Sequence, residues 1–253
     1  MQKLIVGIVS HGHYGYISNN EELTSIAKLA NVEVVVKDNI GDDKLHEYCN
    51  NHNYTYIASQ SPLGFGDNNN SIFEYAKTNL NAKDNDWFIT FNPDVEIKER
   101  YFKLLMAELE KGSSEFYAPN LFKDSEYSVP ENSIRYFATY RDLLNLFFLK
   151  PINRPYDKAE LKNLQVVDWA SGAFLCIKFS AFAKIGGFDS KYFMYYEDVD
   201  LCYRLKQQNQ PLKFLKGVKA VHKGEYKNRS VFSKHFRWYL NSLFKFLETQ
   251  RVS

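Results

Sequence analysis

Long apolar runs and closely spaced cysteines are both missing from this chain. Nowhere do about 18 apolar residues follow one another, and the first apolar run covers only Leu4 to Val9, so we expect neither a membrane-spanning helix nor a signal peptide. The three cysteines, Cys49, Cys176 and Cys202, lie far apart, which argues against a zinc module and a disulfide framework. A reducing cytoplasm fits this cysteine usage best.

Two common nucleotide-binding motifs are also missing. The residues that follow the first apolar run, Ser10 to Gly15, lack the three-glycine dinucleotide fingerprint. No Gly-x-x-x-x-Gly-Lys-Ser/Thr phosphate loop occurs anywhere in the chain. A nicotinamide-dependent dehydrogenase and a P-loop nucleotidase are therefore both disfavoured.

The chain has enough apolar residues for one large domain, and its charge is unevenly distributed. Of its 253 residues, 45% are hydrophobic, and 32 Lys and Arg stand against 30 Asp and Glu. Residues 201–253 hold 12 of the basic and 2 of the acidic residues, whereas residues 1–200 hold 20 and 28. An acidic body with a basic end makes nucleic-acid binding a poor alternative, and indicates that the basic end faces something anionic.

Alternating apolar runs and amphipathic segments predict an α/β fold with a mostly parallel sheet. In the first half we expect strands at Leu4–Val9, Val32–Lys37, Tyr54–Ala58 and Trp87–Phe91, and helices at Glu21–Leu29, Asp43–Asn51, Ile72–Thr78 and Lys98–Leu109. Beyond Gly112 the alternation weakens. There we expect helices at Arg135–Leu149, Phe179–Ile185 and Glu197–Gln207, with strand character over Val166–Lys178.

The closing stretch, Val231–Leu247, predicts a basic amphipathic helix. Its apolar stripe consists of Phe232, Phe236, Leu240, Leu243 and Leu247. Such a helix either lies on an anionic membrane surface or packs its stripe on the domain or on a second subunit, as in a homodimer.

Polar residues follow three successive expected strands. Asp38 comes after the second strand, Asn70 after the third, and Asn92 and Asp94 after the fourth. In an open α/β sheet these strand ends share one edge, where ligands bind, so the residues are predicted to converge on one cleft. Asp94 is a candidate for holding a divalent cation against a diphosphate, and an Asx turn is its simpler alternative.

The second half contributes further candidates. Glu197 and Asp198 begin an expected helix, where acidic residues also serve as caps. Trp169 and Gly172 could line a sugar site, although core packing of the tryptophan is the simpler alternative. His222 follows a short apolar run and could bind a metal or be structural.

Taken in order, these motifs resemble those of inverting nucleotide-sugar glycosyltransferases with the GT-A fold. The matching stretches are Asp38-Asn39, Gly64-Phe65-Gly66, Asn69-Asn70, Asn92-Pro93-Asp94, Trp169, Ser171-Gly172-Ala173-Phe174, Gly187-Phe188-Asp189, Phe193-Met194-Tyr195, Glu197-Asp198-Val199-Asp200 and His222. The start, Ser10-His11-Gly12-His13, and the basic tail around Arg229 are similar to the bacterial O-antigen rhamnosyltransferases.

The resemblance implies a role for each matched residue. Asp38 and Asn70 would line the pocket for the nucleotide base of the donor, and Asn92 and Asp94 stand where the family has its Asp-x-Asp motif. Asp94 and His222 would bind a divalent cation, Mg²⁺ or Mn²⁺, while Arg229 would close over the diphosphate. Asp198 would be the catalytic base. Trp169, Gly172 and Glu197 would lie on the acceptor side.

The resemblance also implies a reaction and its partners. The expected donor is dTDP-L-rhamnose and the expected acceptor is N-acetylglucosamine linked to a polyprenol diphosphate, used in O-antigen or other surface-polysaccharide synthesis. The enzyme would then be cytoplasmic and peripheral to the inner face of the cell membrane. A different donor, such as galactofuranose or a hexose, and a non-catalytic nucleotide-sugar-binding scaffold are the alternatives. We expect a glycosyltransferase domain at 1–225, with a donor half to 112 and an acceptor half from 113, and a basic segment at 226–253.

Overall fold

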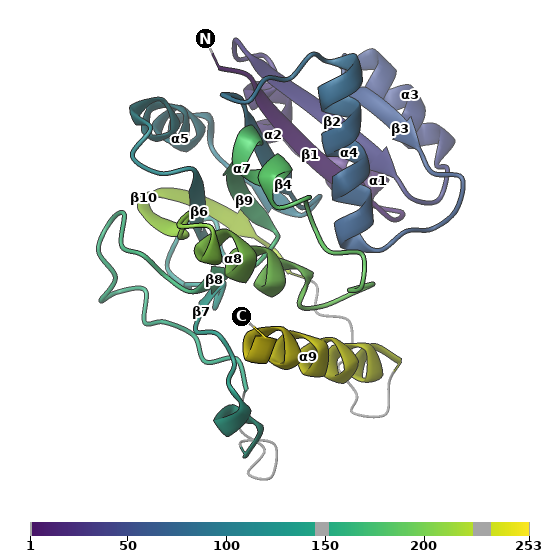
Figure 1. Cartoon of the computed structure of the whole chain (residues 1–253). Helices are drawn as coiled ribbons and strands as arrows, with labels where there is room; N and C mark the ends of the chain where they lie inside the picture. The colour runs from purple at the N-terminus through teal and green to yellow at the C-terminus, as the bar shows by residue number, and fades with distance from the viewer. Residues whose placement is uncertain (1, 145–151, 225–233, 253) are drawn as a thin grey trace.

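The computed structural model describes residues 2–144, 152–224 and 234–252. Its main feature is a mixed sheet whose strands run in the order β3-β2-β1-β4-β9-β6-β10-β5 (Figure 1). The strands are β1 Leu4–Ser10, β2 Val32–Asp38, β3 Thr55–Ala58, β4 Trp87–Phe91, β5 Val95–Glu96, β6 Phe116–Phe122, β9 Phe174–Lys178 and β10 Lys213–His222. A separate short ladder joins β7 Ile134–Arg135 to β8 Trp169–Ala170. This is the predicted α/β class.

The apolar strand sequences explain why the centre of the sheet is buried on both faces. Strands β3, β2, β1 and β4 are mutually parallel, and every residue of β4 is buried. Such a strand has no solvent-facing side, as expected where helices cover both faces of a sheet. Strand β9 then runs antiparallel between β4 and β6. One sheet thus contains strands from both predicted halves, and the division at residue 112 stays a prediction.

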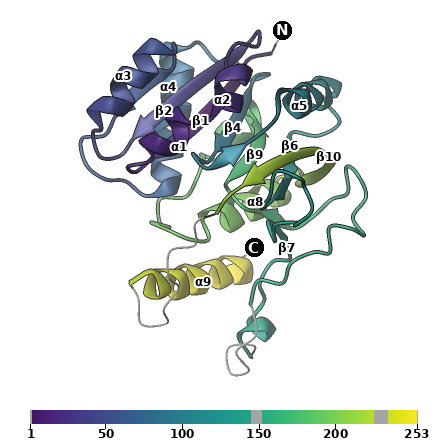
Figure 2. The same cartoon turned by 180° about the vertical axis from the view of Figure 1, so that it is seen from behind.

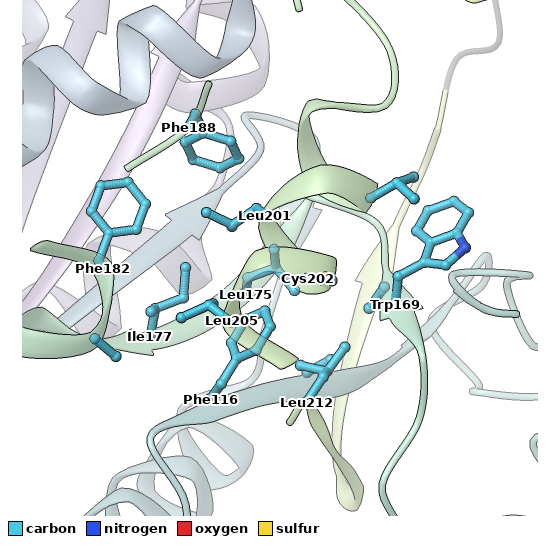
Figure 3. Close-up of a cluster of buried hydrophobic side chains, with 14 of the residues drawn as sticks. Phe116, Trp169, Leu175, Ile177, Phe182, Phe188, Leu201, Cys202, Leu205 and Leu212 are labelled. Atoms are coloured by element: carbon cyan, nitrogen blue, oxygen red, sulfur yellow. The ribbon is translucent and has the colours of Figure 1, made fainter. Parts of the chain in front are cut away.

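Helices cover the two faces of the sheet. One face carries α1 Tyr14–Ser18, α2 Glu21–Ile26, α3 Asp43–Asn51 and α5 Glu99–Lys111; the other carries α4 Phe65–Asn79, α7 Phe179–Lys184 and α8 Glu197–Gln207 (Figures 1 and 2). On the second face, Leu201 and Leu205 of α8 pack towards Leu175 and Ile177 of β9 (Figure 3). Each face therefore has its own apolar core, and the sheet lies between the two.

The second half differs from the expected pattern in two places. In residues 135–143, Arg135 pairs with Trp169 in the short ladder and Tyr140–Leu143 form a 3₁₀ turn, so the expected helix is wrong there, while residues 145–149 lie outside the described residues. Phe116–Phe122, to which we assigned no element, is the fully buried β6. Pro119 is tolerated there because it stands opposite Leu215, beside the irregularity in β10 where the register shifts.

Helix α9, Lys234–Val252, confirms the predicted C-terminal helix and lies alongside α8 (Figure 1). Leu243, Phe246 and Leu247 are completely buried in the same core as α8. The ring of Phe246 lies 5.6 Å from that of Tyr203, centroid to centroid. Leu243 and Leu247 of the predicted stripe, together with Phe246, thus pack on the domain, while Phe244 on the outer side is 49% exposed. Phe232 of the predicted stripe lies outside the described residues.

Candidate active site

Asp94 and His222 meet at one end of the sheet. Asp94 precedes β5 and His222 ends β10, and the pairing of Val95 with His222 brings the two side chains together. His222 Nε2 lies 3.4 Å from Asp94 Oδ1, and the Gly224 N–H donates to Asp94 Oδ2 at 3.0 Å. Burial opposes the charge of both groups, but their hydrogen bonds and mutual attraction outweigh it. The pKa of Asp94 is therefore lowered, and that of His222 is raised to about 9.

The imidazole of His222 has a second carboxylate neighbour. Its Nδ1 lies 2.9 Å from Oε1 of Glu131, which is 3% exposed. No sequence motif pointed to Glu131, because it stands in a polar loop with no spacing that links it to His222. Across the described residues, no group of three or more His, Cys, Asp or Glu is arranged to hold a metal ion.

Asp198 lies half-buried in the first turn of α8. Its Oδ2 accepts from the Gly172 N–H at 3.0 Å and its Oδ1 from the Val199 N–H at 2.8 Å. Desolvation nevertheless raises the pKa of this carboxyl above its usual range. A carboxylate with a raised pKa is a stronger base, so Asp198 is suited to accept a proton.

The loop at Gly172 and Ala173 connects Asp198 with the Asn92-Pro93-Asp94 turn. On one side Gly172 donates to Asp198, and on the other the Asn92 N–H donates to the Ala173 carbonyl at 2.9 Å. A side chain at 172 would approach the Phe65 ring to 3.0 Å and the Asp198 Cβ to 3.4 Å. Glycine thus allows the loop to approach α8 closely. The two acidic positions, about a hundred residues apart in sequence, flank the same short loop.

Glu197 lies beside Asp198 and is 8% exposed. Its Oε2 has no hydrogen-bond partner among the described residues. Burial first, and then the neighbouring charge of Asp198, raise the pKa of Glu197 to about 8, so its carboxyl is mainly protonated at neutral pH. A protonated carboxyl can donate as well as accept a hydrogen bond.

Asp38 lies at the end of β2, where we predicted it, but it is completely buried. Its carboxylate accepts from the Ile40 N–H at 3.1 Å, the Tyr56 hydroxyl at 2.8 Å and the Asp42 N–H. Burial would raise its pKa, but these donors outweigh burial and lower it. In this structure Asp38 fixes the turn into α3, and its contact with the nucleotide base of the donor stays a prediction.

Two other predicted site residues also have structural partners. Asn70 Oδ1 accepts from the Phe188 N–H at 2.9 Å and its Nδ2 donates to the Phe188 carbonyl at 2.8 Å, which ties α4 to the loop before α8. Trp169 is 6% exposed, and its indole N–H donates to the Tyr136 carbonyl at 2.9 Å, in accord with the core-packing alternative (Figure 3). Arg229 lies outside the described residues.

Several curated proteins resemble this chain along much of its length. No protein-family model matches it. Rhamnosyltransferase WbbL of Escherichia coli (strain K12) is 34% identical over 245 residues, which cover 97% of this chain and 92% of WbbL. The N-acetylglucosaminyl-diphospho-decaprenol L-rhamnosyltransferase of Mycobacterium tuberculosis (strain CDC 1551 / Oshkosh) is 29% identical over 143 residues, covering 54% of this chain and 47% of the relative.

Solved structures agree on the fold. GalNAc-T7 with UDP, GalNAc and Mn²⁺ superposes with a TM-score of 0.72 at 15% identity, covering 98% of this chain and 48% of that protein. The mannosyltransferase PcManGT of Pyrobaculum calidifontis, with GDP-Man and Mn²⁺, has a TM-score of 0.58 at 13% identity, covering 89% and 58%. Together with the match to WbbL, the fold shows that this chain belongs to the rhamnosyltransferase family of GT-A-fold glycosyltransferases.

Proposed function

We propose that the protein transfers L-rhamnose, with inversion, from dTDP-L-rhamnose to N-acetylglucosamine linked to a polyprenol diphosphate. The observation that carries this proposal is the shared loop, in which Gly172 donates to Asp198 while Ala173 accepts from Asn92. Asp198, the proposed base, and Asn92 and Asp94, the proposed diphosphate site, thus lie on two sides of one short segment. The rhamnose and the lipid-linked acceptor in this proposal are taken from the names of the relatives reported above.

Asp198 is the base in this mechanism. It takes the proton from the acceptor hydroxyl as that oxygen attacks the anomeric carbon from the face opposite the nucleotide. The bond to the departing diphosphate breaks in the same step, which inverts the configuration. The hydrogen bonds from Gly172 and Val199 hold the carboxylate in place, so its orientation costs little in the transition state.

Asp94 and His222 suit a divalent cation at the leaving group. Their facing atoms, Oδ1 and Nε2, are 3.4 Å apart, close to the separation of about 3 Å expected for adjacent ligands around a small octahedral cation. Oxygen and imidazole nitrogen are ligands accepted by Mn²⁺. When bound, such a cation would neutralise charge on the departing diphosphate. Within residues 2–144, 152–224 and 234–252, only Asp94 and His222 would bind it directly, so the diphosphate and water would complete its coordination.

The protonated carboxyl of Glu197 fits the acceptor side of this site. It is buried next to Asp198, and its Oε2 has no hydrogen-bond partner among the described residues, so bonding to a sugar hydroxyl would require the side chain to turn into the site. Asp198, by contrast, accepts two main-chain N–H groups, which favour its ionised form. We therefore assign binding to Glu197 and proton removal to Asp198.

The acceptor would reach the site at the inner face of the cell membrane. No helix in the described residues is long and apolar enough to cross a bilayer. Near the start of α9, the half-exposed Phe193 lies 5.1 Å from Trp238, ring centroid to ring centroid, and Arg237 and Phe244 are exposed. Aromatic and basic side chains together favour an anionic lipid surface, at about 1 kcal/mol for each Lys or Arg near it.

The experiment is a transfer assay with the purified full chain. A panel of nucleotide sugars is incubated with a short-chain polyprenyl diphosphate N-acetylglucosamine, with Mn²⁺ or with a chelator, and products are analysed by mass spectrometry and NMR. We expect one deoxyhexose to be added from dTDP-L-rhamnose, with inverted anomeric configuration. Transfer from a different nucleotide sugar, and not from dTDP-L-rhamnose, would refute the proposed donor. Donor binding without transfer from any donor would refute the enzymatic function in favour of a scaffold.

A further inference from the structure

Glu131 has no place in the mechanism above, yet it is buried against one of the residues proposed to hold the cation. His222 has carboxylates on both sides of its ring, Glu131 at Nδ1 and Asp94 at Nε2. The contact with Glu131 is 2.9 Å and that with Asp94 is 3.4 Å, so the bond to Glu131 is the tighter of the two. The imidazole is itself buried, at 8% exposure.

The fold holds the Glu131 main chain firmly in place. The Glu131 N–H donates to the Leu121 carbonyl at 3.1 Å, and the Ser133 N–H donates to the Glu131 carbonyl at 2.8 Å. The preceding residue, Pro130, forms a bridge with Phe122 at the end of β6. Because β6 is the neighbour of β10, this loop brings Glu131 to the end of the strand that carries His222.

A buried lysine accompanies this carboxylate. Lys158 is 7% exposed, and its ammonium donates to the Leu121 carbonyl at 2.8 Å and to the Ser133 hydroxyl at 2.9 Å. Burial lowers the pKa of Lys158 to about 8, while the negative charge of Glu131 acts in the opposite direction. Lys158 thus binds the same Leu121 carbonyl that accepts from the Glu131 N–H, and so helps to fix this loop.

We propose that Glu131 is a positioning residue, which accepts the Nδ1–H of His222 and thereby keeps Nε2 facing Asp94, where a bound cation would take the place of the Nε2 proton. This inference rests on the proposed role of Asp94 and His222 as cation ligands. A histidine ligand whose other ring nitrogen donates to a carboxylate has a fixed tautomer, a fixed orientation and a more basic ligating nitrogen. Glu131 would thus act on the cation through His222 without touching it.

The first test measures Mn²⁺ binding by the full chain in the absence of donor and acceptor, with free Mn²⁺ monitored by electron paramagnetic resonance. For Glu131→Ala we expect the dissociation constant to rise about 10- to 100-fold. Glu131→Gln keeps an oxygen that can accept from Nδ1–H, and should recover much of that loss. If folded Glu131→Ala binds Mn²⁺ as tightly as the unchanged protein, the proposal is overturned.

Asp86→Asn is the matched control for removing a buried carboxylate. Asp86 is 3% exposed at the start of β4, at the opposite end of that strand from Asp94, and accepts from the Lys3 and Lys83 N–H groups at 2.7 Å. Thermal melts are expected to show destabilisation in this variant, while its Mn²⁺ dissociation constant stays within about twofold. An equal loss of Mn²⁺ affinity in Asp86→Asn would attribute the Glu131 effect to general destabilisation, and would overturn the proposal.

A second measurement separates this inference from the proposed function. The ¹⁵N shifts of the His222 ring, recorded at pH 10 without metal, report which nitrogen bears the proton. We expect the Nδ1–H tautomer in the unchanged protein and in Glu131→Gln, and a shift towards Nε2–H in Glu131→Ala. An Nε2–H tautomer in the unchanged protein overturns the positioning role, whereas an Nδ1–H tautomer without any Mn²⁺ binding supports it and refutes only the cation site.

Discussion

Replacing Asp198 by asparagine removes the proposed base with the smallest change of shape. In the structure each carboxylate oxygen accepts one main-chain N–H, from Gly172 at 3.0 Å and from Val199 at 2.8 Å. An asparagine side chain has a single oxygen, so its NH₂ group must face one of these donors. One main-chain N–H then loses its partner, which costs about 1–3 kcal/mol. The raised pKa of Asp198 shows that folding disfavours its charge, so removing that charge offsets part of this cost.

The effect on the reaction is expected to be larger than the effect on stability. A general base contributes about 10²- to 10⁴-fold to a rate, which corresponds to about 3–5 kcal/mol of activation free energy. We therefore expect kcat for Asp198→Asn to fall by at least a hundredfold. Donor binding should change little, because the base acts on the acceptor. The assay is release of dTDP in the presence of acceptor, with donor affinity measured separately by calorimetry.

Glu197→Gln is the matched control, since it makes the same change at the adjacent residue. The pKa of Glu197 is raised to about 8, and glutamine resembles the protonated carboxyl that prevails at neutral pH. We expect kcat within about tenfold of the unchanged enzyme. If Asp198→Asn, folded and with normal donor affinity, keeps its kcat while Glu197→Gln loses it, the assignment of the base is refuted.

Three further predictions concern stability and the membrane surface. The pKa of His222 is raised to about 9 in the folded state from about 6.5 when unfolded. With chelator present, its contribution of about 3 kcal/mol to the free energy of unfolding is complete below about pH 6.5, declines between about pH 6.5 and 9, and is absent above. Because Glu197 and Lys158 also titrate near this range, the measurement is the difference in urea stability between the unchanged chain and His222→Gln, and a difference that grows with pH would contradict the prediction. Asn70→Ala removes both hydrogen bonds to the Phe188 main chain and should cost about 1–3 kcal/mol; an unchanged urea midpoint would exclude that tie between α4 and the loop. Phe246→Ala should lower the free energy of unfolding by about 3–5 kcal/mol, because the ring is completely buried. Phe244→Ala, at an exposed ring, should leave the free energy of unfolding within about 0.5 kcal/mol but reduce the fraction of protein that sediments with anionic vesicles. Unchanged sedimentation of Phe244→Ala would show that Phe244 does not contact the lipid.

Local pattern was sufficient for most of the first half of the fold. The apolar runs at Leu4 and Val32 are strands buried by helices on both faces, and Asp43–Asn51 is a helix with the predicted bounds. The helix expected at Ile72 begins earlier, at Phe65. Its first turn has the polar sequence of a loop, but the side chain of Asn68 donates to the Gly64 carbonyl within that turn.

Long-range pairing overrode local pattern in the second half. The aromatic spacing after Arg135 is helical, but Arg135 pairs with Trp169, and the Tyr136 N–H donates to the Arg154 carbonyl. Neither partner is close in sequence, so periodicity could not reveal them. The same holds for Glu131, whose contact with His222 joins residues 91 positions apart. Sequence motifs singled out Asp94 and Asp198 as candidates. The loop at Gly172 and Ala173 that lies between them could be recognised only in the folded structure.

The most direct test is a crystal structure of the chain with dTDP and Mn²⁺, using the anomalous signal of manganese. We expect a manganese peak coordinated by Asp94 and His222, with the diphosphate of dTDP on the same ion and Asp198 facing the open side of the bound nucleotide. Manganese or diphosphate bound away from Asp94, or a nucleotide site that Asp198 does not reach, would contradict the proposed mechanism.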